Sequence, residues 1–346
     1  MEGADEMRRQ SFMLGAAIAV MATAAGAVSL AYRRDMRAIR DKVARGSRIA
    51  RTSVGSIEYA EEGAGFPLLL IHGAGGGYDQ GLMIGRDYGK GYRVVAPSRF
   101  GYLKTPLPED ASPAAQADAH AALLDWLNID KALVVGISAG GPSAIELGLR
   151  HPARVQALLL IVPRAYDPSG SIGPDKSFES RLVFRAIEAS ADFLLWAMIK
   201  IARRSVVRFL GVLPEVEAAA SAEDRARVTE VMESILPLSG RIQGIVAEGA
   251  VELSPWPLDR LTMPVLIISA EDDLFGTLPG ARFTAAGIPG SELHVLESGG
   301  HLMVGQREHV NRWIADFLNR VGVGVGAPPR AVSEPAPIAQ QEAAIA

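Results

Sequence analysis

The chain has 346 residues, of which 49% are apolar and 21% are charged, so it is long enough and apolar enough to bury a full-sized core. Its net charge of −4 provides no basic field for a phosphate backbone, so nucleic acid is excluded as a partner. The chain contains no cysteine, which also excludes disulfides, thiolate metal sites and cysteine nucleophiles.

The amino-terminal segment differs in composition from the rest of the chain. An uncharged stretch, Ser11 to Tyr32, lies between Arg8-Arg9 and Arg33-Arg34. A helix of that length can cross a bilayer, so residues 1–47 are predicted to form a membrane anchor and a basic juxtamembrane segment. The excess of Lys and Arg after the stretch predicts that the main domain is cytoplasmic. A cleaved signal peptide or a twin-arginine export signal is the alternative, and export would make the domain periplasmic or secreted.

Short apolar runs between residues 48 and 320 predict an α/β domain with one mostly parallel, eight-stranded sheet and flanking helices. The first two strands, Ile49–Ser53 and Ser56–Ala60, are close enough in sequence to form an antiparallel hairpin. The others are continuous apolar runs, which are typical of strands covered on both faces. These runs lie at 67–71, 92–96, 132–135, 157–162, 265–269 and 293–296.

Helical patterns alternate with these strands. Ser112 and Pro113 are typical of a helix start, and the helix that they begin is expected to end near Leu127. From about residue 164 to 255 the strand pattern disappears and apolar helical stretches replace it, which predicts an inserted helical cap. Residues 321–346 are rich in Gly, Ala, Pro and Val and are predicted to form a disordered tail.

A G-x-S-x-G pattern follows the strand at 132–135. Gly136, Ser138 and Gly140 fill its fixed positions, and a helical pattern begins directly afterwards. A tight strand-to-helix turn exposes the serine, requires small neighbours and places the positive end of a helix near developing negative charge. Ser138 is therefore predicted to be a catalytic nucleophile.

The histidine predicted to act with this serine is His301. It follows the last predicted strand, in the run Ser298-Gly299-Gly300-His301, and precedes a helical pattern at 306–318. A neutral imidazole can accept the serine proton as general base and later return it. The spacing of the other histidines and acids supplies no set of three convergent ligands, so no metal and no cofactor are expected.

With these motifs in this order, residues 48–320 resemble the α/β-hydrolase fold family. The resemblance implies an oxyanion loop after the third strand, where the chain reads His-Gly-Ala-Gly-Gly-Gly from His72. It further implies that the backbone N–H groups of Ala74 and Ala139 bind the oxyanion of a tetrahedral intermediate. The supporting residues of the two loops are then His72, Gly73, Gly136 and Gly140.

The resemblance also selects the third catalytic residue. Three acids, Glu271, Asp272 and Asp273, follow the strand at 265–269, and the family's G-x-x-D pattern aligns Asp273 with the acid that orients the histidine. Glu271 and Asp272 are then expected to be solvated neighbours. The family's second position for this acid, after the sixth strand, offers Asp167 as the alternative.

One loop departs from the family's pattern. After the fourth strand the family usually has D-x-x-G-x-G, whereas this chain reads Ala-Pro-Ser-Arg-Phe-Gly-Tyr from Ala96 to Tyr102. The segment is structural in the family, so the departure does not affect the predicted triad. Phe100 or Tyr102 either packs in the core or faces the substrate.

A serine nucleophile predicts acyl transfer to water, whereas an aspartate there would indicate epoxide or haloalkane chemistry. The expected protein is a serine hydrolase that cleaves a small-molecule carboxylic ester or lactone through an acyl-enzyme. Carbon–carbon bond hydrolysis, acyl transfer to an alcohol and perhydrolysis remain open, as does a non-catalytic binding protein with this fold. Aromatic and basic residues between 178 and 209 suggest a cap that takes lipophilic esters at a membrane, although simple packing of the cap explains them too.

Overall fold

The computed structural model describes residues 2–88, 91–170 and 192–323, and it divides the chain into two compact units, Met1–Arg45 and Gly46–Ala346. The first unit is the helix α1 (Glu2–Arg45). Among the residues whose side chains are described, no helix is long and apolar enough to cross a membrane. The side chains of residues 11, 12 and 14–19, which belong to the predicted span, are not among those described.

The predicted membrane anchor is therefore not confirmed by the described residues. In the described part of α1, large apolar side chains such as Val20, Met21 and Val28 alternate with alanines and Gly26. An alanine methyl group removes little apolar area from water, so such a stretch gains less by entering lipid than a run of larger apolar side chains does.

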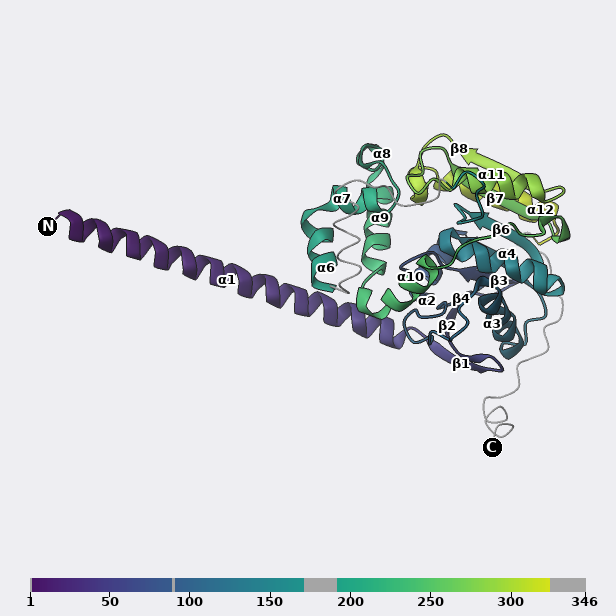
Figure 1. Ribbon diagram of the computed structural model, residues 1–346, viewed down its shortest axis with the longest axis horizontal. Helices are drawn as coiled ribbons and strands as arrows, with labels where there is room; N and C mark the ends of the chain where they lie inside the picture. Colours follow the sequence, from purple (N-terminus) through teal and green to yellow (C-terminus); the bar gives the residue numbers. More distant parts are fainter. Residues whose placement is uncertain (1, 89–90, 171–191, 324–346) are drawn as a thin grey trace, which may run out of the picture. The chain divides into compact units, whose positions relative to one another are not determined.

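The second unit is built on one sheet of eight strands in the order β1-β2-β4-β3-β5-β6-β7-β8 (Figure 1). Strand β1 pairs antiparallel with β2, which pairs antiparallel with β4, and all other neighbours are parallel. The predicted fold class, with its hairpin before the parallel strands, is thus confirmed. The strands are β1 (Arg48–Thr52), β2 (Gly55–Glu62), β3 (Pro67–Ile71), β4 (Arg93–Pro97), β5 (Ala132–Ile137), β6 (Val155–Ile161), β7 (Val265–Ala270) and β8 (Glu292–Leu296).

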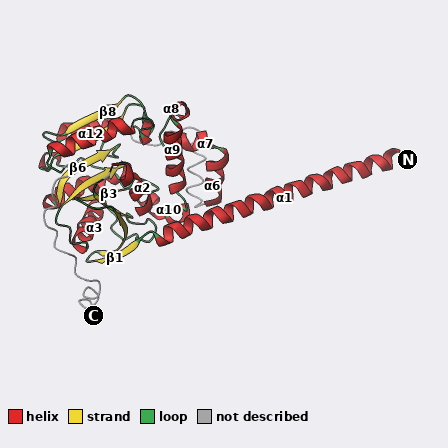
Figure 2. Ribbon diagram, turned by 180° about the vertical axis from the view of Figure 1, so that it is seen from behind, coloured by secondary structure: helices red, strands yellow, loops and turns green. Residues whose placement is uncertain are grey.

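Helices cover both faces of this sheet and form two cores with it (Figure 2). Successive side chains of a strand point to opposite faces, so Leu69 and Ile71 of β3 enter one core while Leu68 and Leu70 enter the other. This two-sided burial explains why the strands are continuous apolar runs in the sequence. The flanking helices are α2 (Tyr78–Tyr88), α3 (Pro113–Trp126), α4 (Gly141–Arg150), α11 (Leu278–Gly287) and α12 (Arg307–Arg320).

The start of α3 is determined by two residues. The Ser112 hydroxyl accepts the Ala115 N–H at 3.2 Å and Pro113 opens α3, as predicted.

Beyond α12 the chain is described as far as Val323, whose carbonyl accepts the Tyr92 hydroxyl at 2.7 Å. Residues 324–346 of the predicted tail lie outside the described residues. Short 3₁₀ helices occur at Ser138–Gly140 (η1), Pro152–Arg154 (η2), Leu238–Gly240 (η3), Leu258–Arg260 (η4) and Gly300–Leu302 (η5).

The described part of the segment between β6 and β7 is helical, which confirms the predicted cap. Its described helices are α6 (Asp192–Ile201), α7 (Arg203–Phe209), α8 (Pro214–Ala219), α9 (Ala222–Ser234) and α10 (Ile242–Gly249). The first part of the predicted aromatic and basic stretch, 178–191, lies outside the described residues.

The described part of that stretch is divided between packing and surface. Leu195 and Trp196 are buried in the cap, whereas Phe193 is half-exposed. Two of the basic side chains nearby are paired within the cap, since Arg203 lies 2.6 Å from Glu217 and Arg204 lies 2.9 Å from Glu215. These pairs reduce the positive charge available to anionic lipid, which favours the packing explanation.

Candidate active site

Ser138 lies on the sharp turn that joins β5 to η1 and α4. Its φ of +48° is in the left-handed region, which residues with a Cβ seldom adopt. The predicted supporting glycines have steric reasons to be small. A Cβ on Gly136 would lie 2.6 Å from the Ala144 Cβ, and one on Gly140 would lie 2.5 Å from the Ile71 carbonyl oxygen. The turn therefore requires the G-x-S-x-G pattern that the sequence carries.

The structure brings the three predicted catalytic residues together from distant parts of the chain. The Ser138 hydroxyl lies 2.9 Å from His301 Nε2, across a sequence separation of 163 residues. The other ring nitrogen, Nδ1, lies 2.8 Å from Asp273 Oδ2. Because the carboxylate can only accept, it fixes the proton on Nδ1 and leaves Nε2 to accept the serine proton.

Asp273 is buried in the loop after β7 and is saturated with donors. Besides the imidazole it accepts the Phe275 N–H at 2.9 Å and the Thr277 hydroxyl at 2.5 Å. Burial raises the pKa of Asp273, but His301 and these hydrogen bonds outweigh burial and hold the pKa below its ordinary value. The side chain is thus an anion that faces His301 throughout the neutral range.

The neighbouring acid, Asp272, has a role that the sequence did not reveal. Its carboxylate accepts the N–H groups of Gly299 and Gly300 at 3.1 and 2.7 Å. Rather than being merely solvated, it anchors the loop that carries His301. The alternative acid, Asp167, instead accepts the N–H and hydroxyl of Ser169.

The cap also holds the histidine. The backbone N–H of His301 donates to the carbonyl of Gly211, in the turn between α7 and α8, at 3.0 Å. The ring of Phe275 meets the imidazole edge-on, with 4.6 Å between the ring centroids. Neither residue belongs to a motif, and only the folded cap places Gly211 beside the loop after β8.

The loop after β3 lies directly beside Ser138. A Cβ on Gly73 would be 3.2 Å from the Ser138 Cβ. The buried His72 accepts the backbone N–H of Arg99 on Nε2 at 3.0 Å. The ring proton therefore lies on Nδ1, which donates to the Gly73 carbonyl at 2.7 Å. Burial, reinforced by the charge of Arg99, lowers the pKa of His72 well below its usual value, so the ring is neutral.

A cavity of about 420 Å³ opens in front of Ser138 and His301. Ala74 and Ala139, the predicted oxyanion residues, both line it beside the serine. Its polar lining side chains include Gln80, Arg164, Arg227 and Glu248. The apolar lining includes Ile84, Ile161, Val231, Ile235, Ile245, Phe209, Leu210, Phe275 and Leu302. Within the described ranges, no group of His, Asp and Glu side chains is arranged to hold a metal ion.

Two curated relatives of this chain are named as hydrolases. A 2-hydroxymuconate semialdehyde hydrolase from Pseudomonas sp. (strain CF600) is 38% identical over 106 residues, which is 29% of this chain and 38% of that protein. A 2-hydroxy-6-oxononadienedioate/2-hydroxy-6-oxononatrienedioate hydrolase from Dechloromonas aromatica is 25% identical over 289 residues, which covers 79% of this chain and 95% of the relative.

A solved α/β-hydrolase fold protein from Nakamurella multipartita shares 29% identity with this chain, with a TM-score of 0.64, and the match covers 80% of this chain and 99% of that one. Other solved structures with this fold are described as esterases or lactonases, and their identities of 19–22% show the fold alone. The family model for the alpha/beta hydrolase fold matches residues 67–307, from β3 to the start of α12. The chain therefore belongs to the α/β-hydrolase fold family.

Proposed function

We propose that this α/β hydrolase is a serine hydrolase that cleaves carboxylic esters or lactones. The observation that carries the proposal is the continuous hydrogen-bond chain from Asp273 through His301 to Ser138, with distances of 2.8 and 2.9 Å. This chain opens onto a cavity with an apolar lining. An oriented histidine within hydrogen-bond distance of a serine is the arrangement that activates a hydroxyl for attack.

The proposed reaction has two halves. Ser138 Oγ attacks the ester carbonyl carbon while His301 Nε2 takes the hydroxyl proton, and the imidazolium then gives this proton to the departing alcohol. Water next attacks the acyl-enzyme, again losing a proton to Nε2, and the acid leaves as Ser138 recovers its proton. The Ala74 and Ala139 N–H groups bind the oxyanion in each half.

The cavity lining supports an uncharged, lipophilic substrate. The two arginines that line it already donate to protein groups. Arg227 pairs with Asp87 at 2.6 Å, and Arg164 donates to the carbonyls of Glu248 and Val251. Transfer of an apolar acyl chain into such a lining is favourable by about 0.8 kcal/mol for each buried CH₂ group.

Carbon–carbon bond hydrolysis is the second candidate, because the Dechloromonas relative that matches over most of its length bears the name of a dioate hydrolase. That reaction would use the same serine and histidine. The binding of a dianionic substrate requires cationic partners. Arg227 is already paired with Asp87, and the guanidinium of Arg164 is directed to two backbone carbonyls, which favours the ester.

Labelling with a fluorophosphonate tests whether Ser138 is an activated nucleophile. Wild type should be labelled, whereas Ser138→Ala and His301→Ala should not. Ser143→Ala is a matched control, since this buried serine lies one turn further on and donates to the Gly140 carbonyl. Failure of correctly folded wild type to react would refute the proposal and favour a non-catalytic binding protein.

A substrate panel then separates the two reactions. Hydrolysis of p-nitrophenyl esters with four- to eight-carbon acyl chains, with kcat/KM well above that for a 2-hydroxy-6-oxo-dienoate, is the expected result. The reverse preference would support the carbon–carbon hydrolase and overturn the ester proposal.

A further inference from the structure

The carbonyl groups of the two proposed oxyanion peptides are both held in place. The Ala74 N–H belongs to the same planar peptide as the Gly73 carbonyl, and the Ala139 N–H belongs to the same peptide as the Ser138 carbonyl. The Ser138 carbonyl accepts the backbone N–H of Arg164 at 2.9 Å. A donor that fixes a carbonyl therefore also fixes the direction of the N–H on the opposite side of that peptide.

The Gly73 carbonyl accepts three hydrogen bonds. The backbone N–H of Gly76 donates to it at 3.3 Å. The two side-chain donors are His72 Nδ1 at 2.7 Å and the Arg99 guanidinium, through Nη2, at 3.1 Å. Both donors are buried, so their hydrogen bonds are little weakened by competition with water. Polarisation of the carbonyl by a cation also strengthens the N–H of the same peptide as a donor.

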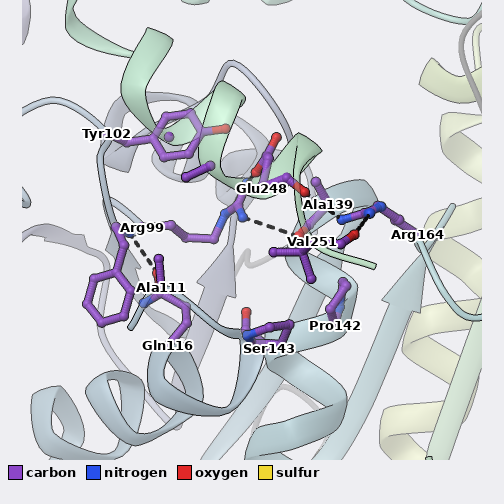
Figure 3. A pocket seen from close by; sticks show the side chains of 14 residues that line it. Arg99, Tyr102, Ala111, Gln116, Ala139, Pro142, Ser143, Arg164, Glu248 and Val251 are labelled. Carbon is purple, nitrogen blue, oxygen red and sulfur yellow. Dashed lines mark hydrogen bonds and ion pairs between the residues drawn. The ribbon is translucent and has the colours of Figure 1, made fainter. Parts of the chain in front are cut away.

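The same guanidinium reaches the nucleophile turn. Arg99 Nη1 donates to the Ala139 carbonyl at 3.2 Å, so one rigid group connects the loop after β3 with the turn after β5. Its charge is balanced by Glu248 on the cap helix α10, whose carboxylate lies 2.5 Å from Nη2. Figure 3 shows the guanidinium of Arg99 extending toward Glu248 and Ala139.

We propose that Arg99 is a positioning residue for the oxyanion hole and that Glu248 of the cap holds it in its working orientation. The proposal rests on the proposed serine hydrolase function. Arg99 touches no reacting atom and acts through the Gly73–Ala74 peptide and the Ala139 carbonyl. Lysine cannot replace it, because a single ammonium lacks the planar fork that serves two carbonyls and a carboxylate at once.

Helix α10 is fixed independently of this ion pair, which allows the pair to be tested without removing the cap. The Gly244 N–H donates to the Gly101 carbonyl at 3.0 Å. Arg164 donates to the carbonyls of Glu248 and Val251 at 3.0 and 2.5 Å. Substitution of the Glu248 side chain therefore leaves these backbone contacts in place.

The test compares Arg99→Met, Arg99→Lys and Glu248→Gln with wild type in the full-length protein. Fluorophosphonate titration counts active sites, and p-nitrophenyl ester hydrolysis gives kcat per active site and KM. Arg93→Met is the matched control, because Arg93 pairs with Glu61 elsewhere on the sheet, at 2.7 Å. Affinity for a trifluoromethyl ketone, which forms a tetrahedral adduct with the serine, provides a readout specific to the oxyanion hole.

We expect kcat per active site to fall about 10- to 100-fold in Arg99→Met and Arg99→Lys, with KM changed less than threefold, since loss of a whole oxyanion donor costs about 10²- to 10³-fold. Affinity for the trifluoromethyl ketone should fall by a similar factor. Glu248→Gln, which keeps a hydrogen-bond acceptor, should show a smaller loss of the same kind and remains informative if Arg99→Met does not fold. Arg93→Met should match wild type.

Two results would overturn the positioning role while wild type remains active. One is fewer active sites with unchanged kcat per site, which is the behaviour of a purely structural residue. The other is an unchanged affinity for the trifluoromethyl ketone in variants with reduced kcat. Absence of labelling in wild type would instead overturn the serine hydrolase function itself, so the two failures are distinguishable.

Discussion

The Asp273→Asn substitution replaces one carboxylate oxygen by an amide nitrogen without changing the size of the side chain. In the native protein both oxygens accept hydrogen bonds, Oδ1 from the Phe275 N–H and Oδ2 from His301 Nδ1 and the Thr277 hydroxyl. An amide oxygen placed at the Oδ1 position keeps the bond to Phe275, and the NH₂ group then faces the imidazole. The histidine must now accept on Nδ1 and carry its proton on Nε2, where it cannot receive the serine proton.

The opposite amide orientation restores an acceptor for the imidazole but sets the NH₂ group against the Phe275 N–H. Two buried donors then face each other, which costs about 1–3 kcal/mol for the unsatisfied group. The wrong tautomer is therefore favoured, and kcat should fall about 10³- to 10⁴-fold, which corresponds to about 4–5.5 kcal/mol in the activation free energy.

Steady-state hydrolysis of a p-nitrophenyl ester, normalised to correctly folded protein, measures this effect. The adjacent Asp272→Asn is the matched control, because Asp272 bonds to the Gly299 and Gly300 N–H groups rather than to the imidazole. An amide oxygen can still accept one of these bonds, so we expect less than a tenfold loss, with part of the effect in stability. A loss below tenfold in Asp273→Asn, or a larger loss in Asp272→Asn, would refute the assignment of Asp273 as the orienting acid.

Two further predictions follow from buried polar groups. Thr277→Val removes one donor to Asp273 and should lower kcat about 5- to 10-fold, whereas Thr284→Val, at a buried hydroxyl without a hydrogen-bond partner in the described part of the chain, should keep full activity. Burial of His120 lowers its pKa from 6.5 to about 3, so between those pH values the unfolded chain takes up a proton that the folded protein does not. The free energy of unfolding therefore falls by about 1.4 kcal/mol per pH unit from this group as pH falls. Between pH 6.5 and 5, the free energy of unfolding of His120→Gln, measured by urea titration, should fall by about 2 kcal/mol less than that of wild type. An equal pH dependence in both proteins would contradict this explanation.

The sequence predicted the fold, and it also predicted the three residues that the structure brings together, because these features depend on local patterns and on a family resemblance. Strands buried on both faces must be continuous apolar runs, as in Pro67–Ile71, and the sheet was predicted from such runs. The turn at Ser138 requires glycines on both sides, since any Cβ at Gly136 or Gly140 would collide with its surroundings. The order of serine, acid and histidine along the chain completed the prediction.

The membrane anchor stays a prediction. An uncharged stretch between basic pairs is compatible with a span, but the residues with described side chains contain no sufficiently apolar helix. Hydrophobic gain depends on the apolar area of each side chain, and alanine and glycine contribute little of it.

The sequence by itself determined the class of fold, the turn at Ser138 and the choice of His301 as its partner, because each depends on a short stretch of the chain. The family pattern selected Asp273 as the acid, but only the tertiary structure shows that Asp273 faces the imidazole while Asp272 bonds to the loop that carries His301, since that depends on how the loop after β7 meets the loop after β8. The tertiary structure alone also placed Arg99 between the Gly73 carbonyl and Glu248, which are separated from it by 26 and 149 residues. Contacts of this kind leave no local signature, because each partner is chosen by the packing of the sheet and the cap and not by its neighbours in sequence.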